Sequence, residues 1–134
     1  MNELNTERLG RDFPELYALY GGDGNTSFTR FGFARFGFEF GDGWYRLVRT
    51  LSREIVELCR AQDAPIPVAS QVKAKFGVLR FYVEGACPEG FLACLRRAGE
   101  RSARTCERCG EPGERSGRTG VWRTLCADCR EAGT

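Results

Sequence analysis

Hydrophobic residues recur with a helical period in one long stretch of the chain, between residues 44 and 61. The apolar positions return every three or four residues, at Trp44, Leu47, Val48, Leu51, Ile55, Leu58 and Cys59. This spacing places them on one face of an α-helix. Asp42 precedes the stretch and is a candidate N-cap, because its carboxylate can accept hydrogen bonds from the free N–H groups of a first turn. Cys59 extends the apolar face, so we expect a buried thiol there.

Two segments alternate apolar and polar residues, which is the pattern of strands with one buried face. They run from 68 to 76 and from 78 to 84, with a turn expected at Phe76-Gly77. The polar positions include Lys73, Lys75 and Arg80, which would form a basic patch across this hairpin. The patch is either a binding surface or a solvated face.

A phenylalanine-rich segment carries the tetrapeptide Arg-Phe-Gly-Phe twice, at 30–33 and at 35–38. The rings at 36, 38 and 40 alternate, which predicts a third strand over roughly 30–40. Two interpretations stay open for this segment. It forms a core strand, or its arginine and aromatic side chains stack on single-stranded bases.

Two further helices are expected. Asp12 as N-cap and Pro14 in the first turn predict a helix that Gly21-Gly22 ends. A second helix is expected over 89–103, with an apolar inner side formed by Phe91, Leu92, Leu95 and Ala98. Together the elements predict an α+β fold, in which two or three helices pack a small antiparallel sheet.

Four cysteines near the C-terminus form the pattern C-x2-C-x16-C-x2-C, at Cys106, Cys109, Cys126 and Cys129. This spacing is typical of a four-cysteine zinc site. Two residues between cysteines allow one tight turn to direct both sulfurs at a tetrahedral metal. We therefore expect one structural Zn²⁺, with two disulfides or free thiols as the alternatives. Four thiolates leave no open ligand position, so the metal would not be catalytic.

The 134 residues include no histidine. Its absence removes the usual general base and the Ser–His and Cys–His pairs, so we expect no enzymatic activity and no small-molecule substrate. The apolar runs are too short for a membrane helix, and residues 1–5 lack the features of a signal peptide. Three thiols outside the zinc pattern suit a reducing compartment, which favours a cytoplasmic location.

The formal net charge of +2 is unevenly distributed, since residues 96–134 carry 9 basic and 6 acidic side chains. One Zn²⁺ on four thiolates would cancel it. A line of arginines runs along the helix expected over 89–103 and into the first cysteine pair, at Arg97, Arg101, Arg104 and Arg108. Such a line is placed to contact phosphates, or it serves only solubility.

The segment Thr105-Cys-Glu-Arg-Cys-Gly-Glu-Pro-Gly, with Thr124-Leu-Cys-Ala-Asp-Cys-Arg-Glu-Ala, resembles the zinc finger of DksA/TraR-type proteins. That finger is a treble-clef-like four-cysteine module. The resemblance implies a zinc module over 105–134, packed on an α+β domain over 1–104. The family's long coiled coil, which enters RNA polymerase, is not visible upstream, so its transcriptional role is not carried over.

A second resemblance covers residues 38–129. Gly41-Asp-Gly-Trp, then Gln71-Val-Lys-Ala-Lys-Phe-Gly-Val-Leu-Arg-Phe-Tyr and the four-cysteine end, are similar to small uncharacterised bacterial and phage proteins. The resemblance implies a phage or mobile-element setting. It favours an adaptor or inhibitor that docks a protein partner, such as a host defence complex (anti-CRISPR-like) or a transcription complex. The alternative is a nucleic-acid-binding zinc protein that uses the arginine line and the hairpin patch.

Overall fold

The computed structural model describes residues 1–19, 37–118 and 120–132. Its main body is a sheet of β1 (Phe38–Glu39), β2 (Val68–Lys75) and β3 (Val78–Glu84). The helices are α1 (Glu3–Asp12), α3 (Tyr45–Ala61), α4 (Phe91–Ser102) and α5 (Ala127–Ala132), with a 3₁₀ turn, η2, at Asp42–Trp44. A second small sheet pairs β4 (Glu114–Ser116) with β5 (Arg123–Leu125).

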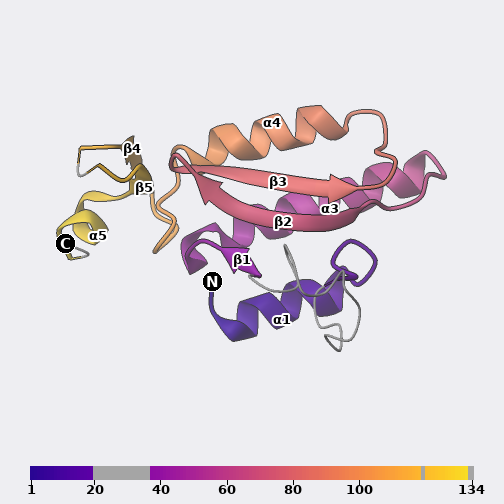
Figure 1. The fold of residues 1–134 in the computed structure, drawn as a ribbon, viewed down its shortest axis with the longest axis horizontal. Helices are drawn as coiled ribbons and strands as arrows, with labels where there is room; N and C mark the ends of the chain where they lie inside the picture. The colour runs from indigo at the N-terminus through magenta and orange to yellow at the C-terminus, as the bar shows by residue number, and fades with distance from the viewer. Residues whose placement is uncertain (20–36, 119, 133–134) are drawn as a thin grey trace.

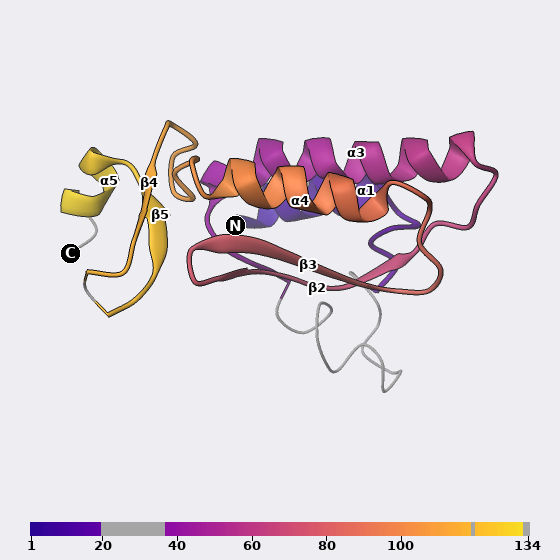
Figure 2. The ribbon, with the colours of Figure 1, turned by 90° about the horizontal axis from the view of Figure 1, so that it is seen from above.

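The elements form two layers with an extension at one end. Helices α3 and α4 lie on the same side of the sheet (Figure 2). The segment from β4 to α5 projects beyond one end of this body, and α1 lies beyond β1 (Figure 1). The predicted α+β class is confirmed, with a small sheet, four helices and a C-terminal cysteine cluster.

The sheet has the order β1-β2-β3 and is mixed rather than antiparallel. Strands β2 and β3 are antiparallel, as expected, but β1 runs parallel to β2, with Phe38 opposite Val72. The prediction of a wholly antiparallel sheet was therefore wrong. The physical reason is the connection, since α3 lies between β1 and β2 and returns the chain to the end where β1 began, as a parallel pair requires. The first part of the expected strand, up to residue 36, lies outside the described residues.

The apolar face of α3 forms the centre of the core, as its period predicted. Trp44, Val48 and Ile55 have no exposed surface, and Cys59 is equally buried. Burial of each such aliphatic side chain stabilises the fold by about 1.5–3 kcal/mol.

Aromatic rings connect this helix face to the sheet. Phe38 and Phe40 are 6% and 7% exposed, and their ring centroids lie 5.9 Å apart. Phe40 lies 5.5 Å from Trp44, and Phe38 lies edge-on to Tyr17 at 5.2 Å. Of the two interpretations of the phenylalanine-rich segment, the core one therefore holds at positions 38 and 40.

The helix predicted to begin at Asp12 is wrong, because α1 ends at that residue and turns follow over 14–19. Asn2 caps α1 by accepting a hydrogen bond from the Asn5 N–H at 2.8 Å. Pro14 explains the end of the helix, since the residue before a proline is disfavoured in the α region. Phe13 accordingly has φ −130° and ψ 62°.

Asp42 does not cap α3, which corrects a second prediction. The turn η2 moves the start of α3 to Tyr45, and neither helix has a side-chain cap. The Asp42 carboxylate instead accepts hydrogen bonds from the Asn2 backbone N–H at 2.7 Å and from the Asn5 side chain at 3.3 Å. It thereby joins the start of α1 to the start of η2.

The hairpin is confirmed, with its turn at Phe76-Gly77. Both residues have positive φ, of 55° and 78°. A two-residue turn of this kind requires positive φ at both positions because only then does its twist match that of the strands.

Candidate metal centre

The structure brings together Cys106, Cys109, Cys126 and Cys129. Their four Sγ atoms all lie within 4.8 Å of one another. The Sγ atoms of Cys109 and Cys126 are 3.6 Å apart. A tetrahedral metal with bonds of ~2.3 Å places its sulfur ligands ~3.8 Å apart, whereas a disulfide bond is ~2.05 Å long. All seven cysteines are free thiols, so the cluster has the dimensions of a metal site.

Each cysteine pair is held by a tight local turn. After Cys106, the Gly110 N–H donates to the Cys106 carbonyl at 2.9 Å, and Gly110 has φ +84°. This conformation favours glycine. At the second pair, the Cys129 N–H donates to the Cys126 sulfur at 3.4 Å, at the start of α5. N–H groups directed at sulfur stabilise the thiolate form that a metal ligand needs.

The thiols differ in their ionisation. Burial opposes ionisation of Cys106, but backbone N–H groups of Cys126, Cys109 and Arg108 outweigh it and lower the Cys106 pKa to about 6. The hydrogen bond to Cys126, with burial and the neighbouring thiols, raises the Cys129 pKa to about 12. Four thiols this close cannot all ionise without a nearby cation. The cluster is therefore suited to a metal ion, whose positive charge would offset part of the negative charge of the four thiolates.

The cysteine module (residues 105–132) is anchored to the start of α3. The Gly43 N–H donates to the Glu107 carbonyl at 2.8 Å, and the Trp44 indole N–H donates to the Thr105 carbonyl at 2.8 Å. Gly43 lies so close to the turn that an added Cβ would be 2.6 Å from the Gly110 nitrogen. Real Cβ atoms almost never approach closer than 3.0 Å. The segment Gly41-Asp-Gly-Trp therefore forms the seat of the first cysteine turn.

The hairpin turn of the main sheet forms a second anchor. The buried Thr124 hydroxyl donates to the Gly77 carbonyl at 2.7 Å, and Arg115 Nε donates to the Phe76 carbonyl at 2.6 Å. Because β4 and β5 carry these two side chains, the small sheet is held against the end of β2 and β3. The module thus contacts both layers of the main body.

Glu107 is a structural residue that the sequence did not identify. It is 5% exposed and accepts from Arg123 Nε at 2.7 Å, which ties the first cysteine turn to β5. Its other oxygen lies 3.4 Å from the Gly41 N–H. The two glycines of Gly41-Asp-Gly-Trp were the only sequence signal for this close approach.

The predicted arginine line is not one free surface. Arg97 pairs with Glu54 at 3.3 Å, and Arg108 donates to the Cys129 carbonyl at 3.2 Å. Arg101 and Arg104 are exposed and form no ion pair with the described residues. Two of the four arginines are thus available to a ligand.

The hairpin patch lies on the other face of the sheet. Lys73 is directly opposite Arg80, and both alternate with residues that face the helices, such as Val72 and Phe81. Lys75 is exposed near the turn. Because α4 covers the inner face, Arg101 at its end and Lys73 of this patch lie in different layers, so the predicted arginine line and the hairpin patch do not form one continuous surface.

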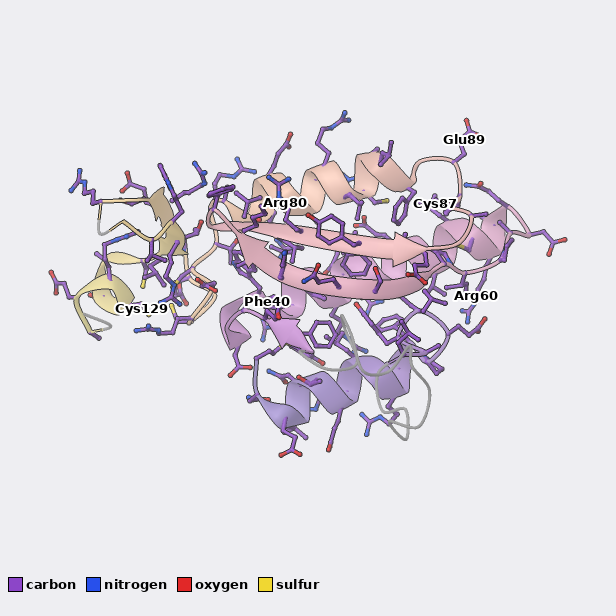
Figure 3. All side chains as sticks on the ribbon, viewed as in Figure 1. Phe40, Arg60, Arg80, Cys87, Glu89 and Cys129 are labelled. Atoms are coloured by element: carbon purple, nitrogen blue, oxygen red, sulfur yellow. The ribbon has the colours of Figure 1, made fainter. Side chains whose placement is uncertain are left out.

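The remaining three cysteines are separate from the cluster. Cys59 and Cys94 are buried, which raises the pKa of both thiols. Cys87 is exposed at the opposite end of the molecule from Cys129 (Figure 3). None of the three is placed to serve as a ligand at the cluster.

Comparison with protein-family models, with curated proteins and with solved structures gives no match to this chain. None of the described helices has the length and apolar character needed to cross a membrane.

Proposed function

We propose that this chain is a non-enzymatic zinc protein whose cysteine module docks a protein partner. Zinc is the metal we propose because four clustered thiolates are the ligand set of closed, structural zinc sites. The observation that carries the docking proposal is an exposed apolar pair on the module. Val121 is 63% exposed and Trp122, beside it, is 44% exposed.

The proposed role of zinc is structural. Among the described residues of the module, the buried apolar side chains are Cys106 and Leu125. So small a segment cannot bury enough apolar surface to fold alone, and a metal commonly supplies the missing stabilisation. The metal would therefore hold the module in the shape that presents Val121 and Trp122.

Trp122 has the properties of an anchor at a protein interface. Arg115 stacks over its ring at 4.2 Å, and the backbone of Gly117 lies directly against the indole. Both contacts fix the ring before a partner arrives, which lowers the entropic cost of binding. A hollow of about 680 Å³ beside it is lined by Arg118, Arg130 and the ligand Cys126, among others. Tryptophan and arginine are the residues most often found at the energetic centre of interfaces.

The partner class that we propose comes from the resemblance to phage proteins, and is a host defence or transcription complex. The test is affinity capture from bacterial lysate with three tagged chains, namely the native one, Trp122→Ala and a matched control. Leu4→Ala is the control because Leu4 is also an exposed apolar residue, at 56%, on α1. A partner retained by the native and Leu4→Ala chains but lost from Trp122→Ala would support the proposal. Equal recovery with all three zinc-loaded chains, or none with any, would count against it.

A nucleic-acid-binding role is the second candidate, and one observation favours it. Lys73 and Arg80 are direct cross-strand neighbours of like charge, an unfavourable pair that Glu39, opposite Lys73 on β1, offsets only on the Lys73 side. Tyr82, 43% exposed, lies on the same face, with Lys73 Nζ 6.0 Å from its ring centroid. Fluorescence anisotropy with labelled single-stranded DNA and RNA tests this role. It predicts salt-dependent binding that Arg80→Glu weakens, whereas an Arg101→Glu, Arg104→Glu double variant tests the arginine line separately.

A further inference from the structure

We propose that an extended acidic peptide binds along β3 as an additional antiparallel strand, in the groove between β3 and α4. This groove shares no lining residue with the hollow beside Trp122, so it goes beyond the docking role proposed for the cysteine module. The partner is a protein segment in which acidic and apolar residues alternate.

In the part of the chain that the structure describes, β3 is an edge strand of the sheet. Lys75 and Val78 are paired across the two-residue turn, so Val78, Arg80 and Tyr82 direct their backbone groups at β2. The N–H and C=O groups of Leu79, Phe81 and Val83 therefore point to the open side. The Leu79 N–H confirms this alternation, because it donates to Ser102 Oγ of α4 at 2.9 Å. Those of Phe81 and Val83 have no partner among the described residues.

A groove of about 470 Å³ adjoins this edge. The strand contributes Leu79, Phe81 and Tyr82, and the helix contributes Leu95, Arg96 and Gly99. Helix α4 follows β3 along its length in Figure 1. Gly99 carries no side chain. A Cβ added there would lie 3.8 Å from the nearest atom, Val78 Cγ1. The groove is therefore bounded by a strand edge on one side and a helix face on the other.

The helix face extends beyond the groove as an exposed apolar surface. Contrary to the sequence prediction, Leu92 does not lie on the inner side of the helix but is 77% exposed. It lies three residues before Leu95, so both share one face of α4. Because Ser102 meets Leu79, the antiparallel helix brings Leu92 towards the Val83 end of the strand. An added strand would cover Leu92 while it pairs with Phe81 and Val83. This mode of recognition takes affinity from backbone hydrogen bonds and specificity from alternate side chains.

Charge identifies the partner as acidic. Arg80 and Arg96 line the groove, and no acidic residue is among the described residues that line it. Neither arginine forms an ion pair with a described residue, and Lys73 lies directly opposite Arg80. A second copy of this chain would bring the same two arginines to the groove, which disfavours self-pairing. The two faces of the added peptide then match the protein. Its glutamates lie on the Arg80 side, and its valines lie towards Leu92 and Leu95.

The test uses an acetylated, amidated peptide of alternating glutamate and valine, added to the zinc-loaded full chain and followed by NMR of backbone amides. The peptide is expected to shift β3 and α4 resonances and to slow hydrogen exchange at Phe81 and Val83. Arg80→Glu and Arg96→Glu should each weaken binding tenfold or more. Arg60→Glu is the matched control, since Arg60 is an exposed arginine at the C-terminal end of α3 and does not line the groove (Figure 3).

Backbone methylation of the peptide separates strand addition from simple charge attraction. The peptide residues that pair with Phe81 and Val83 place their side chains on the same face of the sheet as these two residues and direct their N–H groups at β3. These peptide residues are the valines. N-methylation of the valines should abolish binding, and N-methylation of the glutamates should leave it within about threefold, which is under 0.7 kcal/mol. The proposal would be overturned if both methylated peptides lost binding equally, or if the unmethylated peptide shifted no amide resonance at millimolar concentration. A dimer formed through β3, or tighter binding of a single-stranded oligonucleotide at the same resonances, would overturn it too. Trp122→Ala should not alter peptide binding, so failure of the module's docking role would be seen separately.

Discussion

Gly43→Ala tests the contact between the first cysteine turn and the start of α3. The added methyl group would lie 2.6 Å from the Glu107 carbonyl carbon and 2.6 Å from the Gly110 nitrogen, and it would overlap the Cys106 carbonyl oxygen. All of these atoms are backbone, so no flexible side chain can move aside. The cysteine turn must shift as a unit.

The cost follows from two effects. Overpacking against a rigid neighbour destabilises by about 1–3 kcal/mol, and contacts this short place Gly43→Ala at the upper end. The shift also lengthens the 2.8 Å hydrogen bond from Gly43 to Glu107, which contributes about 1 kcal/mol. Unfolding free energy should therefore fall by about 3–4 kcal/mol, which lowers Tm by roughly 10 °C for a chain of this length.

The assay is thermal and urea unfolding of the zinc-loaded protein, with a zinc titration in parallel. Gly99→Ala is the matched control, because its new methyl group meets only Val78 Cγ1 at 3.8 Å. Alanine in place of a helical glycine stabilises by about 0.5–1 kcal/mol, so the same substitution should have opposite signs at the two positions. Zinc affinity should fall for Gly43→Ala alone, since its shift moves Cys106 and Cys109. The packing argument would be refuted if the Tm of the Gly43→Ala chain lay within about 2 °C of the native Tm, a difference no larger than the uncertainty of the fitted Tm values.

Three further outcomes are expected. Trp44→Phe keeps one aromatic ring but removes the indole N–H that donates to the Thr105 carbonyl and leaves a small cavity, so calorimetry should show a loss of at least about 1–2 kcal/mol, and an unchanged Tm would contradict it. Glu107→Gln removes the charge paired with Arg123, which is 37% exposed, so a loss of only about 1–2 kcal/mol is expected in urea, and less in high salt. Burial raises the pKa of the Tyr17 hydroxyl above 10.0, so stability that is complete below pH 10 should fall as pH rises further. Tyr17→Phe should flatten that alkaline limb, and identical limbs in the two proteins would disprove the assignment.

The sequence predicted the elements whose pattern is local. The period of α3 and the alternation of β2 and β3 were sufficient because each segment buries one face of its own. The cysteine spacing likewise placed four sulfurs together, since two short turns determine most of that geometry.

The sequence did not predict what depends on distant neighbours. The parallel direction of β1 follows from the path of the chain through α3, and no feature of Phe38 or Phe40 encodes it. Asp42 is of a residue type that commonly caps a helix. Because the extra turn η2 precedes α3, the Asp42 carboxylate instead accepts hydrogen bonds from Asn2 and Asn5. Glu107 was indistinguishable from a surface charge until its contacts with Gly41 and Arg123 were seen. The groove beside β3 is equally invisible in sequence, because an open strand edge is a property of the whole sheet.

Metal content is the measurement that tests the central claim most directly. The chain should be purified without added zinc and its metal quantified by inductively coupled plasma mass spectrometry, with native mass spectrometry for the stoichiometry. One zinc per chain is predicted, released by a chelator together with a large fall in Tm, and absent from Cys109→Ser. A folded, metal-free protein whose melting curve is unchanged by chelator would contradict a zinc site that holds the module in place.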